Sequence, residues 1–324
     1  MALAVEVLRS GGLVAIPTET VYGLAADASQ PEAVERIFEV KGRPRNHPLI
    51  VHLADVLQVR EWVAELPELA RRLADAFWPG PLTIVLPKSA RVPHVVTGGL
   101  ETVAVRVPAH TVTRRLLVAF GGGLAAPSAN RFGRVSPTCA ADVVADLGGA
   151  VDLVLDGGRS DVGVESTIVE VVEGAIRLLR PGGVTVEAIE ALTGIAVETD
   201  PGGRPRAPGM LPSHYAPRTE VVACELDEAP DVVERSAAEG LRVAVIAPRP
   251  IDLSRIDSRI DATRDAVVWY WDAGGDEESL SHQLYARMRE ADVSGADRIV
   301  AVLPTPQGLG RAVRDRMTKA AGGR

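Results

Sequence analysis

The sequence predicts an α/β protein with two domains: a twisted mixed sheet with helices, followed by a smaller doubly wound, Rossmann-like domain. Many short apolar runs of β character lie between residues 12 and 183, with helical stretches unevenly placed among them. The segment 200–219 is dense in Pro and Gly and has no periodic apolar pattern, so it is a predicted linker. We therefore expect domains at 1–199 and 220–324.

Short apolar runs define the strands of the first domain. They are expected at residues 13–18, 48–53, 82–87, 102–108, 150–158, 166–172 and 175–182. Residues 31–42 are a predicted helix, because Pro31 suits its first turn and Gly42 its end. A second helix is expected at 66–78. The uneven order of strands and helices favours a mixed sheet over strict βαβ alternation.

The second domain has a regular order of strand, helix, strand, strand, helix, strand and helix. These elements are expected at residues 219–226, 229–239, 242–248, 266–272, 276–291, 298–304 and 309–320. Such alternation is typical of a small doubly wound sheet.

Composition narrows the classes of protein that the chain can belong to. The formal net charge of −8 argues against a protein that coats nucleic acid non-specifically. The two cysteines, Cys139 and Cys224, make no disulfide framework, and the six histidines lack metal-ligand spacing, so no metal site is expected. The start of the chain reads as a helix and a strand, and no apolar run has the length of a membrane span, which favours the cytoplasm.

Several motifs of known chemistry are missing. The chain has no GxxxxGK[ST] loop, no GxGxxG after a strand, no HExxH and no GxSxG. A phosphate ligand would therefore need another kind of site.

A basic cluster precedes the predicted strand at 48–53. Lys41, Arg43, Arg45 and His47 fall within seven residues, with no acid among them. A solvated helix end would explain Lys41, since cations favour a helix C-terminus. It explains the other three less well, because Pro44 has already ended the helix. The cluster suits a polyanion such as a triphosphate.

Polar residues also follow other predicted strands. Residues 17–27 carry Thr18, Glu19, Thr20 and Tyr22, and residues 126–138 form a loop rich in Ser, Thr, Asn and Arg. Taken singly, such residues usually cap or turn the backbone.

Arg106 stands between valines in a predicted strand. It either faces away from them or is buried with an anionic partner, which could be an internal acid or a ligand. The residues thus indicate a pocket for a small anionic ligand, without naming a reaction.

A family resemblance adds a reaction. The chain contains PTETVYGL, KGRPRNHPLIVH, FWPGPLT, VAVRVP, PSANRFGRVSPT, GVESTIV and LRPG in this order. Together they resemble the YrdC-like family, and the linker APGMLPSHYAP with the domain after it resembles the family's two-domain threonylcarbamoyl-AMP synthases. The resemblance implies a nucleotidyltransferase that makes L-threonylcarbamoyl-AMP and pyrophosphate from L-threonine, bicarbonate or CO2, and ATP. The product would serve the N6-threonylcarbamoyladenosine modification of tRNA.

The resemblance also implies site residues. L-Threonine would be held by Thr20, His52, Arg106 and Ser166. ATP, accompanied by Mg²⁺, would be held by Lys41, Arg43, His47, Thr102, Ser128, Asn130, Thr138 and Arg180, with His214 and Tyr215 of the linker as a lid. Lys41 and Arg43 would be catalytic by neutralising the phosphates. Glu19 and Glu165 are candidates for a general base.

Other functions stay open from the sequence. A protein of the same fold could bind RNA, or bind ATP as a regulator, without catalysis. The related domain of hydrogenase-maturation proteins comes with cysteine motifs that are absent here. The expected partners are proteins that transfer the threonylcarbamoyl group to tRNA; direct tRNA binding would be weak or transient, and no membrane is involved.

Overall fold

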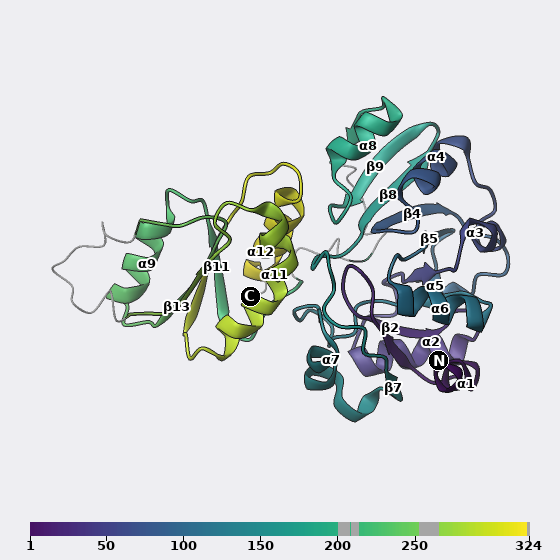
Figure 1. Cartoon of the computed structure of the whole chain (residues 1–324), viewed down its shortest axis with the longest axis horizontal. Coiled ribbons are helices and arrows are strands. Elements are labelled where there is room, and N and C mark those ends of the chain that lie inside the picture. Colours follow the sequence, from purple (N-terminus) through teal and green to yellow (C-terminus); the bar gives the residue numbers. More distant parts are fainter. Residues whose placement is uncertain (200–207, 209–213, 253–265, 323–324) are drawn as a thin grey trace. The chain divides into compact units, whose positions relative to one another are not determined.

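The computed structural model describes residues 1–199, 208, 214–252 and 266–322. It divides into two compact units, drawn in Figure 1. The first comprises Met1–Phe132 and Ser136–Leu211, and the second comprises Gly133–Val135 and Pro212–Arg324. The first unit contains a mixed sheet and the second a parallel one, so the predicted fold class is confirmed.

Ten strands form the sheet of the first unit, in the order β10-β9-β8-β4-β5-β3-β6-β2-β1-β7. In chain order they are β1 (Val14–Ile16), β2 (Gly23–Asp27), β3 (Ile50–His52), β4 (Leu82–Pro87), β5 (Thr102–Arg106), β6 (Leu124–Ala125), β7 (Leu153–Val154), β8 (Thr167–Val172), β9 (Ala175–Arg180) and β10 (Val197–Glu198). The parallel pair β3 and β5 lies at the centre, between antiparallel neighbours on both sides.

Helices pack on both faces of this sheet. They are α1 (Ala2–Arg9), α2 (Pro31–Lys41), α3 (Val56–Trp62), α4 (Glu68–Phe77), α5 (His94–Thr97), α6 (Thr111–Phe120), α7 (Ala140–Leu147) and α8 (Val186–Thr193). In β1, Val14 and Ile16 pack with α1 and α6, whereas Ala15 belongs to the main core with α2. Because successive side chains of a strand point to opposite faces, β1 contributes to a separate apolar core on each face of the sheet.

The helix predicted at 31–42 is confirmed as α2, with Pro31 in its first turn. Gly42 ends it at φ +64°, a left-handed conformation that favours glycine. This end matters for the site, because Lys41 is the last residue of the helix.

Some elements differ from the sequence-based prediction. The strand predicted at 150–158 is limited to β7. The strands β2 and β6 were not predicted, because Gly23–Asp27 lacks β-branched residues and Leu124–Ala125 is only two residues long. Tertiary pairing makes both of them strands: β2 pairs with β1 and β6 on its two edges.

The second unit contains a four-stranded sheet in the order β11-β14-β12-β13, with every neighbouring pair parallel. Its described elements are β11 (Glu220–Cys224), α9 (Ala229–Ala238), β12 (Val243–Ala247), β13 (Val267–Asp272), α11 (Glu277–Val293), β14 (Arg298–Val302) and α12 (Gly310–Ala321). The doubly wound arrangement predicted for this part of the chain is confirmed. Within the described residues, no helix combines the length and the apolarity that a bilayer span requires.

Candidate active site

The candidate site lies on the central strands of the first unit, on the face opposite to the main core. A small apolar cluster marks this face, formed by Ile50, Val85, Ala104, Ile168 and Leu179. His52, Arg106 and Thr83 each lie two residues from a member of this cluster on their own strand. Because side chains two residues apart point to the same side of a strand, a polar group forms beside the cluster.

Arg106 is the most constrained member of this group. Its Nη2 donates to Glu19 Oε1 at 2.7 Å, its Nη1 to Thr20 Oγ1 at 2.9 Å, and its Nε to the Gly80 carbonyl at 3.1 Å. The Arg106 and Glu19 side chains are only 4% and 8% exposed. The sequence left open whether the anionic partner of Arg106 is an internal acid or a ligand. In the structure an internal acid, Glu19, pairs with Arg106. A guanidinium carries five N–H groups, so two remain for a ligand.

Glu19 acts as the counter-ion of Arg106. Its second oxygen, Oε2, accepts the backbone N–H of Ala109 at 3.0 Å, and the backbone carbonyl of Glu19 accepts from Val162 at 2.7 Å. With both carboxylate oxygens engaged, Glu19 holds the guanidinium in place instead of standing free as a general base. Thr20 is oriented in the same turn, since its hydroxyl lies 2.8 Å from that of Thr18.

His52 lies beside Arg106, because the two residues pair across β3 and β5. Burial, and secondarily the charge of Arg106, lowers the pKa of His52 to about 3. The imidazole is therefore neutral at physiological pH. Its Nδ1 lies 3.4 Å from the Ile50 carbonyl, which can only accept, so Nε2 is left as an acceptor for a ligand.

Ser166 and Arg180 extend the polar group across β4, β8 and β9. The Ser166 hydroxyl lies 2.8 Å from that of Thr83, and Arg180 Nη2 donates to the Ser166 carbonyl at 2.8 Å and to its hydroxyl at 3.1 Å. Arg180 Nη1 also donates to the Pro208 carbonyl at 3.3 Å. The adjacent strands β3, β5, β4 and β9 and the residue before β8 thus place His52, Arg106, Thr83, Arg180 and Ser166 next to one another.

The basic cluster divides into a buried and an exposed part. Lys41 and Arg43 are 3% and 7% exposed, whereas Arg45 is on the surface in an ion pair with Glu35 at 2.7 Å. Arg43 Nη2 donates to the Pro48 carbonyl at 3.0 Å, and its guanidinium lies 5.8 Å from the Phe132 ring centre. Arg45 is therefore a solvated surface residue, whereas Lys41 and Arg43 are not.

Lys41 is held by backbone carbonyls. Its Nζ donates to the carbonyls of Ser128 and Asn130, each at 2.5 Å. Burial lowers the pKa of Lys41 well below its ordinary value, and the charge of Arg43 lowers it further. His47 lies near Arg43, its ring 5.5 Å from that of Phe132, and burial lowers its pKa as well. A cation that has lost its hydration is a favourable partner for an anionic ligand.

The loop 126–138 is fixed at both ends against Tyr22. Tyr22 donates to the Pro137 carbonyl at 2.8 Å, and Ala129 donates to the Tyr22 carbonyl at 2.8 Å. Thr138 accepts from Arg159 Nη1 at 2.9 Å and donates its N–H to Asp142 at 3.0 Å. The predicted residues Ser128, Asn130 and Thr138 thus belong to one ordered loop, which also contacts Lys41.

The remaining predicted residues are Thr102, His214 and Tyr215. Thr102 is the first residue of β5, four residues before Arg106, which is about 13 Å along a strand. His214 and Tyr215 belong to the second unit, where Tyr215 stacks on Tyr285 at 5.9 Å and lies under Arg316 at 4.9 Å. Most of the predicted lid, residues 200–207 and 209–213, lies outside the described residues.

The structure adds Thr83 and Ser136, which the sequence analysis did not assign to the site, and it gives a partner to Glu165, one of the two candidates for a general base. Thr83 has its hydroxyl on Ser166, and Ser136 donates to Glu165 Oε1 at 2.6 Å inside the loop. Thr83 could have been identified from the sequence, because it places a hydroxyl within an otherwise apolar strand. The contact between Ser136 and Glu165 could not be predicted from the sequence, because 29 residues separate them.

Comparisons with known proteins identify the family of the chain. Residues 6–182 match the family described as Telomere recombination, and residues 184–322 match the family described as Threonylcarbamoyl-AMP synthase, C-terminal domain. A threonylcarbamoyl-AMP synthase of Pyrococcus abyssi is 42% identical over 99% of this chain and 93% of its own length. The chain belongs to the threonylcarbamoyl-AMP synthase family.

Other members of the threonylcarbamoyl-AMP synthase family resemble this chain to a similar degree, over most of their length. The Bacillus subtilis enzyme is 40% identical over 100% of this chain and 93% of its own. The crystal structure of Pyrococcus abyssi Sua5 complexed with L-threonine matches with a TM-score of 0.88 and 41% identity, over 99% of this chain and 94% of that chain.

The first prediction concerns the buried ion pair. Glu19→Ala should lower the free energy of unfolding by about 3–5 kcal/mol, because it leaves the Arg106 charge buried and unpaired. Glu68→Ala, which breaks the exposed pair with Arg71, is the matched control and should cost much less. Urea denaturation followed by circular dichroism measures both. Equal losses in the two variants would contradict the counter-ion role.

The second prediction concerns His52. Its pKa is lower in the folded than in the unfolded chain, so between about pH 3 and pH 6.5 the unfolded chain takes up this proton and the folded chain does not. The stability from this group is complete above pH 6.5 and falls by about 2 kcal/mol between pH 6.5 and pH 5. His52→Asn should remove that part of the pH dependence. An NMR titration in which the His52 ring protonates near pH 6.5 would refute the prediction.

Proposed function

We propose that the protein makes L-threonylcarbamoyl-AMP and pyrophosphate from L-threonine, bicarbonate or CO2, and ATP, for the N6-threonylcarbamoyladenosine modification of tRNA. Membership of the threonylcarbamoyl-AMP synthase family gives the reaction class. The observation that carries the proposal to this chain is the Arg106 guanidinium, buried beside a neutral imidazole, with two N–H groups left. Such a fork suits the carboxylate of an amino acid.

In this proposal L-threonine binds along the polar line across the central strands. Its carboxylate takes the two remaining N–H groups of Arg106. His52 Nε2 accepts from the substrate's hydroxyl or from its carbamate N–H, and the hydroxyls of Thr20 and Ser166 supply further hydrogen bonds. The relative crystallised with L-threonine supports this choice of substrate.

ATP would occupy the side of Lys41 and Arg43. The amine of threonine first captures CO2 or bicarbonate as a carbamate; a carbamate oxygen then attacks the α-phosphate, and pyrophosphate leaves. Lys41 and Arg43 neutralise the phosphates, while His47, Thr102, Ser128, Asn130, Thr138 and Arg180 orient the nucleotide, and His214 and Tyr215 cover it. Such a reaction asks mainly for positioning and charge neutralisation.

We expect Mg²⁺ to arrive with ATP. In the described part of the chain, no three His, Cys, Asp or Glu side chains converge as a metal site. Mg²⁺ in ATP enzymes is commonly held by phosphates and water with few protein ligands, and it neutralises phosphate charge. Lys41 and Arg43 supply the protein's share of that neutralisation.

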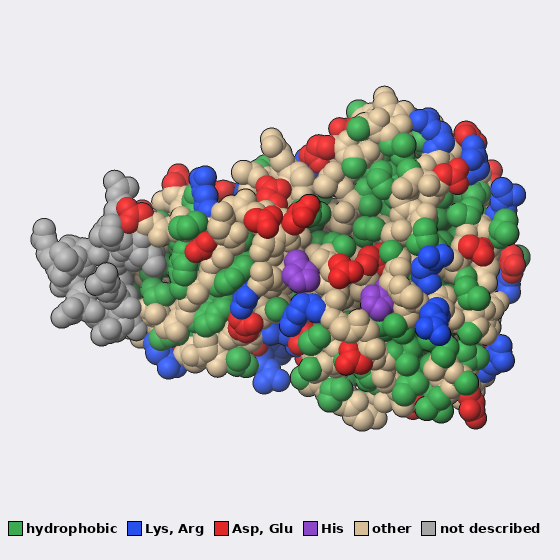
Figure 2. All heavy atoms as spheres, in the orientation of Figure 1, with side chains coloured by type: hydrophobic (Ala, Val, Ile, Leu, Met, Phe, Trp, Pro, Cys, Tyr) green, Lys and Arg blue, Asp and Glu red, His purple; other side chains and the backbone are tan. Residues whose placement is uncertain are grey.

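Non-catalytic RNA binding would need a broad basic face. On the face of the first unit drawn in Figure 2, basic and acidic side chains are scattered among each other. The net charge of −8 points the same way. The proposed partners are therefore the proteins that consume the adenylate.

The reaction is tested by pyrophosphate release from ATP and Mg²⁺. We expect release that requires both L-threonine and bicarbonate, with a product of the mass of threonylcarbamoyl-AMP. A protein that binds both substrates without release would be a regulatory homologue, and the proposed activity would be wrong.

The third prediction separates the buried cations from the exposed one. Lys41→Ala and Arg43→Ala should each lower pyrophosphate release by at least about a hundredfold, because each removes a charge at the phosphates. Arg45→Ala, two residues away and on the surface, should keep the rate within about twofold. Circular dichroism checks that all three variants are folded. Loss of activity in Arg45→Ala as well would show that the whole cluster acts together.

The fourth prediction concerns the fork of Arg106. Arg106→Lys keeps the charge but cannot donate to Glu19, Thr20 and Gly80 together and still hold a carboxylate. The KM for L-threonine should rise by at least about tenfold, while the KM for ATP changes by less than about twofold. An equal rise in both constants would place Arg106 at the nucleotide instead.

A further inference from the structure

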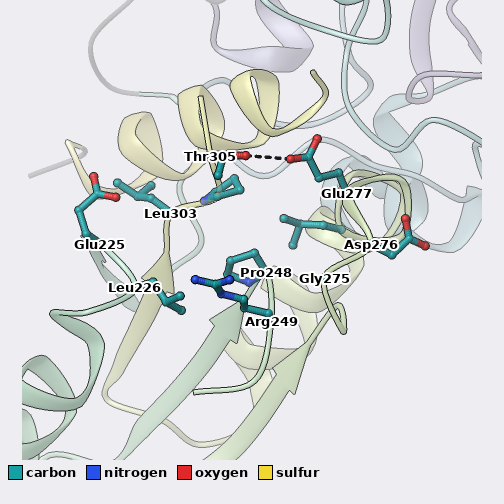
Figure 3. Close-up of a pocket in the computed structure, with 11 residues that line it drawn as sticks. Glu225, Leu226, Pro248, Arg249, Gly275, Asp276, Glu277, Leu303 and Thr305 are labelled. Atoms are coloured by element: carbon teal, nitrogen blue, oxygen red, sulfur yellow. Dashed lines mark hydrogen bonds between the residues drawn. The ribbon is translucent and has the colours of Figure 1, made fainter. Parts of the chain in front are cut away.

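The second unit has a pocket at one edge of its sheet. Because the four strands are all parallel, their carboxyl ends lie at the same edge. The pocket has a volume of about 280 Å³, and its walls come from the segments that follow β11, β12, β13 and β14. Figure 3 shows these side chains around a common hollow.

The sheet topology favours a ligand at this place. The connection from β11 through α9 to β12 and the connection from β13 through α11 to β14 run in opposite directions across the sheet. Right-handed crossovers therefore put α9 and α11 on opposite faces. The helix α12, which follows β14, packs with α11, so the chains leaving the neighbours β11 and β14 diverge to opposite faces. Ligands of open α/β sheets bind in the crevice that such a divergence makes.

The lining combines an apolar floor with a few polar side chains. Its apolar members are Leu226, Pro248, Leu280, Leu303 and Pro304. Glu277 accepts from the Thr305 hydroxyl at 2.9 Å and from the Gly310 N–H at 3.4 Å. The dashed line in Figure 3 marks the first of these two bonds. Glu225 forms an ion pair with Arg314. A cavity with apolar walls and few oriented polar groups is typical of small-molecule sites.

Arg249 is the cation of this lining. It follows β12 and is exposed, and within the described parts of the chain it has neither an ion pair nor a side-chain hydrogen bond. Across the pocket in Figure 3 lies the Glu277 carboxylate, which has lone pairs left after its two hydrogen bonds. With Asp276 also present, the lining holds three acids and one arginine, and Arg314 neutralises one of the acids.

This charge balance selects the class of ligand. A phosphorylated molecule would meet a lining with an excess of negative charge, which opposes its binding. A zwitterion satisfies both signs at once. We propose that the pocket binds a free amino acid with an aliphatic side chain: Arg249 takes its carboxylate, Glu277 its ammonium group, and the apolar floor its side chain. The volume is sufficient for one such molecule.

Saturation-transfer NMR on the full chain tests this inference. The probes are L-leucine, L-isoleucine, L-valine and L-methionine, none of which has the β-hydroxyl of threonine. Two analogues of leucine each lack one charge: 3-methylbutylamine has no carboxylate, and 4-methylpentanoic acid has no ammonium group. Adenosine monophosphate represents the phosphorylated class.

We expect saturable binding of at least one amino acid, and binding of both analogues weaker by about tenfold or more. Arg249→Gln should weaken the binding of the amino acid by about tenfold, and Glu277→Gln should weaken this binding as well. Arg235→Gln, an exposed arginine of α9 outside the lining, is the matched control and should bind as the wild type does. Arg106→Lys should also bind normally, which separates this pocket from the proposed threonine site.

Three results would overturn the inference. They are no saturable binding of any amino acid, amino-acid binding that Arg249→Gln leaves unchanged, and binding of adenosine monophosphate that Arg249→Gln weakens, which would place the nucleotide in this pocket. Pyrophosphate release is measured independently, so failure of this inference leaves the proposed reaction untouched.

Discussion

The buried pair of Arg106 and Glu19 is the constraint on which the first unit's polar face depends. A guanidinium inside a protein must have its charge and its N–H groups satisfied. Three separate segments meet to do this: the turn after β1 supplies Glu19 and Thr20, the segment before β4 supplies the Gly80 carbonyl, and β5 supplies the arginine. Shifting β5 by one residue would turn Arg106 into the main core, so the ion pair and the strand register specify each other.

The same principle accounts for the basic cluster of an acidic protein. Lys41 and Arg43 are buried, and both donate hydrogen bonds to backbone carbonyl oxygens. These oxygens carry only partial charges, but they offset part of the free-energy cost of burying the two cations without a ligand. Internal neutralisation is incomplete, and the lowered pKa of Lys41 expresses that. An anion at this place would complete it. In the proposed function, a substrate anion neutralises the remaining charge of Lys41.

The sequence predicted the class of fold, the helix α2 and most central strands, because apolar periodicity is a local property. It could not predict which acid faces Arg106, since Glu19 is 87 residues away and meets it only through the sheet order. It also left the cluster from Lys41 to His47 open between surface and site. The structure shows that Lys41 and Arg43 are buried, and the burial of Lys41 depends on the loop 126–138 folding over it. Local sequence patterns thus identified the polar residues, whereas long-range packing determines which groups surround them.

The two units use charge in different ways, and this bears on what each can bind. In the first unit Lys41, Arg43 and Arg106 are buried and the acid Glu19 is already engaged, so the two N–H groups left on Arg106 can donate to an anion. In the pocket of the second unit the acids are in excess and one exposed arginine remains. A triphosphate gains from the first arrangement and is repelled by the second. In these proposals the pocket of the second unit therefore binds a different class of ligand from the nucleotide of the first unit, and a positive group on that ligand favours its binding.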